Sequence, residues 1–571
     1  MDFLITNFKT KKSKKVGDLF CLGTCVKSNH SGFVISESSD WRYFSSYDKN
    51  LAILDPSKKI DFEDFYFLAK YDIENDSLTM QTDLIAYETC YCYRDNNFWG
   101  ISDDVLSLIE ALAEINIKIE IDEQFLREYL AFNNVLLDNT VYKGIKRLQP
   151  AAIYQIKVSS FSCSYHIYNN FQMDGTLKTP EESACMMYKC MDTYFKSHFD
   201  ESTEYSIGLS GGLDSRVGAY FAVKNNYNLK PNFIGIENNS FGLKTYDAKR
   251  ACEVANFLHI KKDIVYYDPR NLSFFEKVKF DALNSPTMVD NIGQNLGTIT
   301  KDYVLINGII GGDMIGYFVD DEIINYDDLE LSKYILTKLS NLPQVKSQFI
   351  RRVSIALKLK CLAKINKCPD SVHEELITKE QFDIALKRIF RWVLAQKKMG
   401  LDNINIWHKF YMYNIASVSK TSYYASYSNT VPSLPTFLNQ LVVERALLHS
   451  RTDSILSEMP IQKELFKKLD GLGAIRSQKV ACCIDDKDKK TEKKRILYII
   501  ERIIRGSGME YFRYISDSDI SSGFRSLISP DMVTSKINLK SSVWNTIDRH
   551  VVLSLLKIAY IEKQILDFNR K

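Results

Sequence analysis

The most informative stretch of the chain runs Ser206-Ile207-Gly208-Leu209-Ser210-Gly211-Gly212-Leu213-Asp214-Ser215. Its first residues have the apolar character of a buried strand, its centre is a Ser-Gly-Gly turn, and its end begins a helical pattern. Two adjacent glycines let the backbone approach a ligand closely, and the amides of the first helical residues have no intrahelical partners. Together with the hydroxyl groups of Ser210 and Ser215, these amides predict a nest for phosphate oxygens.

Strand and helix patterns alternate around this turn. The expected elements are a helix over 180–199, a strand over 205–209, a helix over 213–223, a strand over 233–236, a helix around 248–258, and strands over 264–267 and 303–306. This alternation predicts a parallel doubly wound sheet, whose ligands bind at the carboxyl ends of the strands. Beyond residue 330 the pattern is mostly helical and ends in an amphipathic stretch over 544–568.

The part of the chain before this sheet has a different pattern. Short β-type segments separated by polar turns occupy roughly residues 16–160, at 33–35, 43–44, 87–93 and 152–156, with helices expected over 105–115 and 122–132. The strand over 152–156 is expected to close this sheet-rich domain. The polar, glycine-containing segment 169–179 predicts a linker. We therefore expect one domain over residues 1–168 and a second over 178–571.

Composition and charge limit the classes of function. The chain has 571 residues, with 74 Lys and Arg against 71 Asp and Glu, so its formal net charge is +3. This balance supplies no field that favours nucleic acid or an anionic membrane. The first residues lack the pattern of a secretory signal, no apolar run is long enough to span a bilayer, and the 12 cysteines have no regular spacing. We expect a cytoplasmic enzyme with no nucleic-acid partner and no membrane span.

The glycine turn is not a Walker loop, because no Gly-Lys-Ser/Thr follows it, and it lacks the spaced glycines of the dinucleotide fingerprint. Ser-Gly-Gly-x-Asp-Ser resembles the pyrophosphate loop of enzymes that split ATP between its α and β phosphates. A second similar segment over 304–317 reads Val-Leu-Ile-Asn-Gly-Ile-Ile-Gly-Gly-Asp-Met-Ile-Gly-Tyr. On these two motifs the chain resembles the asparagine-synthetase-like superfamily of PP-loop ATP pyrophosphatases.

The resemblance implies a fold for the whole chain. Residues 1–168 would form a degenerate glutaminase-like domain, an α+β sandwich of the Ntn-hydrolase type; Ile101-Ser102-Asp103 and residues 128–132 are similar to parts of that domain. Residues 178–571 would form an α/β doubly wound PP-loop synthetase domain with a helical C-terminal lobe.

The resemblance also implies the site, with ATP and Mg²⁺ as its ligands. The residues implied to bind the nucleotide are Leu209, Ser210, Gly211, Gly212, Leu213, Asp214, Ser215, Gly311 and Gly312. Asp214 and Asp313 would hold Mg²⁺ on the triphosphate, and Lys479 would contact the α-phosphate and the transition state. Hard oxygen ligands suit Mg²⁺, and pyrophosphate is a strongly anionic leaving group. The competing interpretations are a glycine turn used only for geometry, an aspartate that caps a turn, and a surface lysine.

Three departures from the family bear on function. Asp2 stands where glutamine-dependent members carry a cysteine whose own amine acts as its base, and the segments that bind glutamine are not recognisable. Ile310 stands three residues before Asp313, where members place a Glu, Tyr or His that takes part in amide formation. We therefore expect no glutamine hydrolysis.

The resulting expectation is an ATP-dependent, AMP-forming amide ligase that adenylates a substrate carboxylate and joins it to an amine. It is nearest in type to lasso-peptide cyclases and β-lactam synthetases, so the expected partner is a small-molecule, sugar or peptide substrate with a carboxylate, including a peptide precursor. Uronate amidation in bacterial polysaccharide synthesis is a neighbouring alternative. The pair Ile309-Ile310 keeps open a nucleotide-binding scaffold or sensor that has lost ligation. A tRNA-modifying enzyme is a third alternative, which the absence of a basic stripe disfavours.

Overall fold

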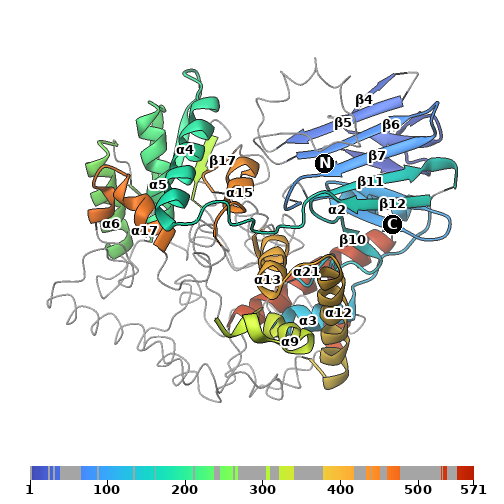
Figure 1. Cartoon of the computed structure of the whole chain (residues 1–571). Coiled ribbons are helices and arrows are strands. Elements are labelled where there is room, and N and C mark those ends of the chain that lie inside the picture. The colour runs from blue at the N-terminus through green and yellow to red at the C-terminus, as the bar shows by residue number, and fades with distance from the viewer. Residues whose placement is uncertain are drawn as a thin grey trace.

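The structure is a computed structural model. It describes residues 3–23, 26–29, 32–38, 66–86, 89–132, 135–160, 162–209, 212–236, 245–260, 264–267, 304–308, 321–339, 377–416, 433–437, 439–450, 460–475, 529, 532–536 and 549–570. Figure 1 shows two sheet-containing regions, one at each side of the molecule, with a group of helices between and below them. Both ends of the chain lie on the side of the N-terminal sheets.

Two antiparallel sheets form the N-terminal region, each with six strands among the residues described. In spatial order, the first consists of β10 (Ile145–Arg147), β8 (Tyr91–Arg94), β9 (Trp99–Ser102), β1 (Leu4–Thr6), β3 (Leu19–Leu22) and β2 (Lys14–Val16). The second consists of β12 (Ser162–Ile167), β11 (Ala152–Lys157), β7 (Ser77–Thr82), β6 (Tyr66–Asp72), β5 (Gly32–Ser38) and β4 (Val26–Asn29). We call the two sheets together the sandwich.

The sandwich is held by side chains that alternate along its strands. Phe3, which directly precedes β1, and Ile5 of β1 lie in the core between the sheets, whereas Leu4 lies in the core on the outer face of the first sheet. The rings of Phe3 and Phe67, from different sheets, are stacked with their centroids 4.9 Å apart. Stacked aromatic pairs add to the free energy gained by burial.

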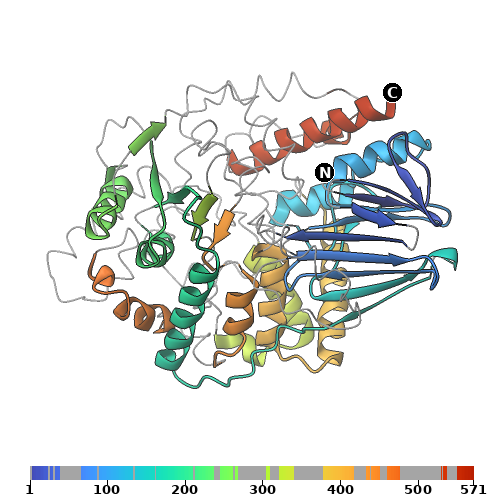
Figure 2. The same ribbon diagram turned by 90° about the horizontal axis from the view of Figure 1, so that it is seen from above.

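Helices cover the outer face of the first sheet. They are α2 (Val105–Glu114), α3 (Glu123–Phe132) and the C-terminal helix α21 (Arg549–Arg570). Leu108 of α2, Leu126 of α3 and Ile558 of α21 are buried in one hydrophobic cluster. Figure 2 shows α21 in red beside the light-blue N-terminal helices. The last helix of the chain therefore packs on the first sheet region, a contact that no local pattern predicts.

The second sheet region is parallel, with five strands in the part of the chain that the structure describes. Its spatial order is β15 (Ile264–Tyr267), β14 (Leu229–Ile236), β13 (Tyr205–Gly208), β16 (Val304–Asn307) and β17 (Ser433–Pro435). The chain runs outward from β13 through β14 to β15 and then returns to the other side of β13 for β16 and β17. The strand order therefore reverses between β13 and β16.

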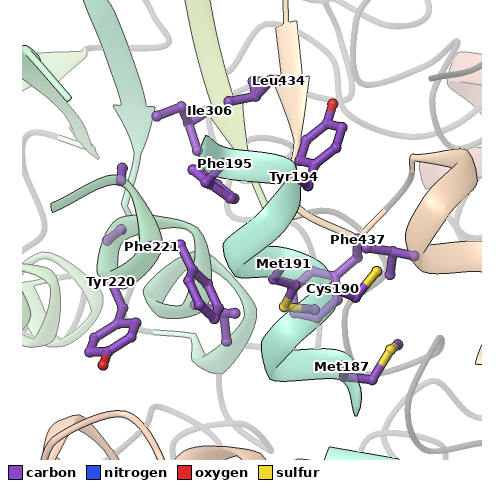
Figure 3. Close-up of a cluster of buried hydrophobic side chains, with 14 of the residues drawn as sticks. Met187, Cys190, Met191, Tyr194, Phe195, Tyr220, Phe221, Ile306, Leu434 and Phe437 are labelled. Carbon is purple, nitrogen blue, oxygen red and sulfur yellow. The ribbon is translucent and has the colours of Figure 1, made fainter. Parts of the chain in front are cut away.

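Three helices come from the same part of the chain as this sheet: α4 (Pro180–Ser197), α5 (Leu213–Lys224) and α6 (Thr245–Phe257). Helix α4 begins with a capping box, in which Thr179 and Glu182 bond each other's backbone amides, and with proline at the first helical position. Its buried residue Phe195 lies 5.9 Å from Phe221 of α5, measured between ring centroids. Figure 3 shows these side chains meeting Ile306 and Leu434 of the sheet in one apolar cluster.

A helical group lies between the two sheet regions. It contains α9 (Asp328–Leu339), α12 (Lys379–Lys398) and α13 (Asn403–Tyr411), while α15 (Gln440–Ala446) and α17 (Pro460–Lys467) pack on α4. Arg388 of α12 forms an ion pair with Glu128 of α3, whose side chain is buried. This pair ties the helical group to the N-terminal region.

Most sequence-predicted elements within the described residues are confirmed. The helices expected over 105–115, 122–132, 180–199 and 213–223 are α2, α3, α4 and α5, with ends that differ by at most two residues. The strands expected over 264–267 and 303–306 are β15 and β16, and the mixed α/β content with antiparallel sheets is also observed.

Other expectations differ from the structure. The strand expected over 87–93 begins at Tyr91. The expectation that the sheet-rich part closes with residues 152–156 is wrong, because β12 follows as an edge strand. Its first five residues are exposed, so it lacks the apolar alternation that would predict a strand. The segment 43–44 lies outside the described residues.

The division into domains at residues 168 and 178 stays a prediction. Residues 168–179 contain no helix or strand, as expected of a linker, yet Phe171 within them is fully buried. Among the helices that the structure describes, none combines the length and the apolar character needed to cross a bilayer.

Candidate functional site

The site is built around the turn from β13 into α5. Tyr205 and Ile207 of β13 are buried in the apolar cluster that includes residues of α4 and α5, and Ser206 between them is also buried. Helix α5 begins after Gly212, an N-cap residue in extended conformation that has no side chain to accept from the first amides. Those amides carry the positive end of the helix dipole, which favours an anion at this position.

Asp214 lies in the first turn of α5 and is half-buried. One of its carboxylate oxygens, Oδ1, accepts a hydrogen bond of 3.0 Å from Nε2 of Gln462, a residue of α17. The next residue, Ser215, is 9% exposed, and its hydroxyl lies 3.5 Å from the carbonyl oxygen of Gly212. The carboxylate and the hydroxyl are therefore both present at the start of the helix, as the motif predicts.

Gly308 brings the end of β16 against the start of α5. A Cβ atom at Gly308 would lie 2.6 Å from the carbonyl carbon of Asp214 and 2.7 Å from the amide nitrogen of Ser215. Contacts this short with backbone atoms cannot be relieved by a side-chain rotation, so this position requires glycine. Gly308, the first glycine of the second motif, therefore lies against the helix start of the first motif.

This convergence occurs at the reversal of strand order. Ile207 of β13 pairs with Ile306 of β16 in parallel register, so both strands end at the same edge of the sheet. In open parallel sheets, ligands bind in the crevice outside the carboxyl ends of the strands where the order reverses. Asp214 and Gly308 are at this point of the sheet.

Helix α5 is tied to residues 460–475, which we call the α17–η7 segment because it contains α17 and the 3-10 helix η7 (Leu472–Ala474). The guanidinium of Arg216, a fully buried side chain, donates to the carbonyl of Ile475. The hydroxyl of Tyr220 donates to Asp470 over 2.6 Å. Three side chains of α5 therefore form hydrogen bonds with this segment: those of Asp214, Arg216 and Tyr220.

Five of the predicted site residues are described and lie together at this turn: Leu209, Gly212, Leu213, Asp214 and Ser215. The other six lie outside the described residues: Ser210, Gly211, Gly311, Gly312, Asp313 and Lys479. The described residues that precede them, Gly308 and Ile475, both contact α5. The isoleucines at 309 and 310 also lie outside the described residues.

Sequence analysis missed two residues at this site. Gln462 follows Asp214 by 248 positions on a short amphipathic helix, and nothing in its neighbourhood marks it as a polar partner. Arg216 follows the motif directly, and its position offered a signal, since an arginine on the buried side of a predicted helix needs a buried acceptor.

The residues present at the turn fit a magnesium-bound polyphosphate. Gly308 brings the end of β16 close to the amide nitrogen of Ser215, which leaves no room for a Cβ. Asp214 supplies carboxylate oxygen, which suits Mg²⁺, and Ser215 supplies a hydroxyl group.

The N-terminal region has its own ordered feature at the start of β1. The amide of Phe3 donates to Asp103 over 3.0 Å, and the hydroxyl of Ser102 donates to the carbonyl of Phe3 over 2.7 Å. These bonds fix the backbone that follows Asp2, a residue outside the described ranges.

No protein-family model matches this chain, and no curated protein sequence matches it either.

Proposed function

We propose that the protein is an ATP-dependent, AMP-forming amide ligase of the asparagine-synthetase-like type. The observation that carries the proposal is the contact between Gly308 and the first turn of α5 beside Asp214, at the reversal of strand order in a parallel sheet. This arrangement supports a polyphosphate site at the Ser-Gly-Gly-Leu-Asp-Ser turn. The face-to-face packing of two antiparallel sheets in the N-terminal region supports the relation to a glutaminase-like domain.

In this proposal the substrate carboxylate attacks the α-phosphorus of ATP and pyrophosphate leaves. A neutral amine then attacks the carbonyl carbon of the acyl-adenylate, which forms the amide and releases AMP and a proton. The amides at the start of α5 would bind phosphate oxygens, and Asp214 with Asp313 would hold Mg²⁺. When bound, the ion neutralises the leaving pyrophosphate. Lys479 would stabilise the charge that grows on the α-phosphate, and the chain leads to it from Ile475, which Arg216 holds against α5.

Glutamine hydrolysis is not part of the proposal, because Asp2 and not cysteine precedes the ordered start of β1. The amine would come from the substrate or from a second substrate. A small molecule, sugar or peptide with a carboxylate is the substrate class, and uronate amidation is one case within it.

The test has two stages and uses the full chain. Binding of the α,β-methylene analogue of ATP is measured by calorimetry with and without Mg²⁺, and then pyrophosphate release is measured across a panel of carboxylate substrates. We expect Mg²⁺-dependent binding, and release that Asp313→Ala lowers by roughly a hundredfold or more. Absence of Mg²⁺-dependent binding would overturn the nucleotide site.

The competing function is a nucleotide-binding scaffold or sensor. It predicts the same Mg²⁺-dependent binding without pyrophosphate release for any carboxylate of the panel. Pyrophosphate release that depends on one carboxylate, together with AMP in equal amount, would exclude the scaffold.

A further inference from the structure

Of the three described contacts between α5 and the α17–η7 segment, the hydrogen bond of Gln462 involves a predicted site residue, Asp214. Arg216 and Tyr220 contact the segment from within α5, through the carbonyl of Ile475 and the carboxylate of Asp470. Gln462 contacts Asp214, in the turn where β16 approaches the helix. This glutamine therefore links the C-terminal part of the chain to the carboxylate of the glycine turn.

Gln462 is itself held firmly. Its side chain is 3% exposed, and its neighbours Ile461 and Leu465 are buried in the apolar cluster that includes α4 and α5. A buried amide that donates to a carboxylate tends to keep that orientation, because leaving its donor without an acceptor costs free energy. The direction of the hydrogen bond to Asp214 is thus set by the packing of α17.

The chemical type of this donor is informative. A lysine or arginine at position 462 would form an ion pair with Asp214 and neutralise the charge that a cation needs. A neutral amide can orient a carboxylate through one oxygen and leave its negative charge in place. Outer-shell hydrogen bonds of this kind orient metal ligands and affect metal affinity.

We propose that Gln462 is a positioning residue that sets the orientation of the Asp214 carboxylate for Mg²⁺-nucleotide binding. The inference rests on the proposed function and extends it to a residue outside both glycine turns. It assigns to α17 a role in cation affinity, in addition to its role in packing.

The experiment measures the Mg²⁺ concentration that gives half-maximal binding of the α,β-methylene analogue of ATP. Gln462→Met keeps nearly the same side-chain volume but removes the donor, so the fold should be retained. We expect the half-saturating Mg²⁺ concentration to rise by roughly ten- to a hundredfold, as expected for a lost hydrogen bond to a charged group. Gln462→Leu, which also lacks the donor and cannot ionise, should raise it at least as much.

Tyr220→Phe is the matched control. It removes the hydroxyl that bonds Asp470, and so weakens the same pair of elements without touching Asp214. We expect its Mg²⁺ dependence to stay within about twofold of the wild type, since its contact does not orient the carboxylate. A shift in Tyr220→Phe equal to that in Gln462→Met would show general anchoring and overturn the inference.

Asp214→Asn separates the inference from the function on which it rests. If Asp214→Asn weakens Mg²⁺-dependent binding while both Gln462 variants behave as the wild type, the positioning role is wrong and the nucleotide site stands. If Asp214→Asn also has no effect, the site assignment itself fails. Thermal unfolding of each variant identifies any that does not fold, and the remaining Gln462 variant then decides.

Discussion

The sandwich and the parallel sheet region differ in how closely their packed layers approach each other. In the sandwich, large side chains fill the space between sheets, as the stacked rings of Phe3 and Phe67 illustrate. In the parallel region, helix α5 lies directly against the sheet. A Cβ at Gly218 of α5 would lie 2.5 Å from Oγ1 of Thr436. Gly308 lies directly against backbone atoms of the first turn of α5, with no side chain between them.

The difference bears on where a ligand can bind. Side-chain packing excludes water and stabilises the fold, but it also covers the backbone. Glycine lets two backbone segments approach closely at a strand end, where helix amides favour an anion. The two regions therefore predict opposite responses to mutation: loss of stability in the sandwich and loss of binding in the parallel region.

The largest effect of a single substitution on stability is expected in the sandwich. Phe67→Ala removes a fully buried ring that stacks on Phe3, and we expect it to lower the free energy of unfolding by about 3 to 5 kcal/mol. Urea denaturation measures the loss. At a temperature where the variant is folded, its affinity for the Mg²⁺-nucleotide should be unchanged. A tenfold change in affinity would contradict the claim that substitutions in the sandwich affect stability and not binding.

The next effect concerns two buried histidines between the regions. Burial lowers the pKa of His408 to about 4, with an opposing hydrogen bond to the Phe171 backbone, and burial also lowers the pKa of His449 to about 4, aided by the nearby His408. In the unfolded chain both titrate near 6.5, so below that pH only the unfolded state takes up protons. Stability should fall by roughly 3 kcal/mol per histidine as the pH falls from 6.5 to 4.

Denaturation midpoints measured across this pH range check the histidine prediction. His408→Leu should flatten the pH dependence by about half, since it removes one of the two groups. His166→Gln, at an exposed position on β12, is the matched control and should leave the profile unchanged. A wild-type profile that is flat between pH 6.5 and 4 would contradict the prediction.

A pair of glycines tests the comparison directly. Gly308→Ala places a methyl group against backbone atoms that cannot move independently, and we expect nucleotide affinity to fall by roughly a hundredfold. Gly100→Ala in the sandwich places one 2.8 Å from Cδ1 of Leu108, a side chain that can rotate. It should cost about 1 to 3 kcal/mol of stability and leave affinity intact. Calorimetric titration of both variants distinguishes the two responses.

The smallest expected effect concerns the hydrolysis of glutamine. We expect glutamate release from glutamine at the rate of an enzyme-free control, because an aspartate at residue 2 cannot use its own amine to activate a thiol or hydroxyl. A coupled glutamate assay on the full chain measures it. Release that disappears on truncation of residues 1–8 would assign an activity to the sandwich and remove the functional difference between the regions.

Sequence patterns predicted those helices and strands that are determined by residues close together in the chain. Helix α4 is an example, because the Thr179 and Glu182 capping box and the proline between them all lie within four residues. The parallel strands were also predictable, since short apolar segments alternating with helical patterns leave few other arrangements. The strand β17 was missed because three residues with proline at the end carry no usable periodicity.

The candidate site was likewise predictable only where neighbouring residues of one motif define it. The glycine turn identified Asp214 and Ser215, since backbone freedom and hydroxyl donors are properties of the residues themselves. The approach of Gly308 depends on β16 lying next to β13, and the hydrogen bond of Gln462 depends on where α17 packs. Neither relation produces a pattern in the chain near Asp214.

The amino-acid sequence by itself determined the chemistry available: a strand, two glycines, a carboxylate and a helix start in one run of ten residues. Those features follow from backbone freedom and from spacing along the chain, which any reader of the sequence can see. Tertiary structure alone decided that β16 lies beside β13, that the last helix packs on the first sheet, and that Gln462 reaches Asp214. The physical reason is that burial of apolar surface brings together residues hundreds of positions apart, and burial depends on the whole fold and not on any one segment.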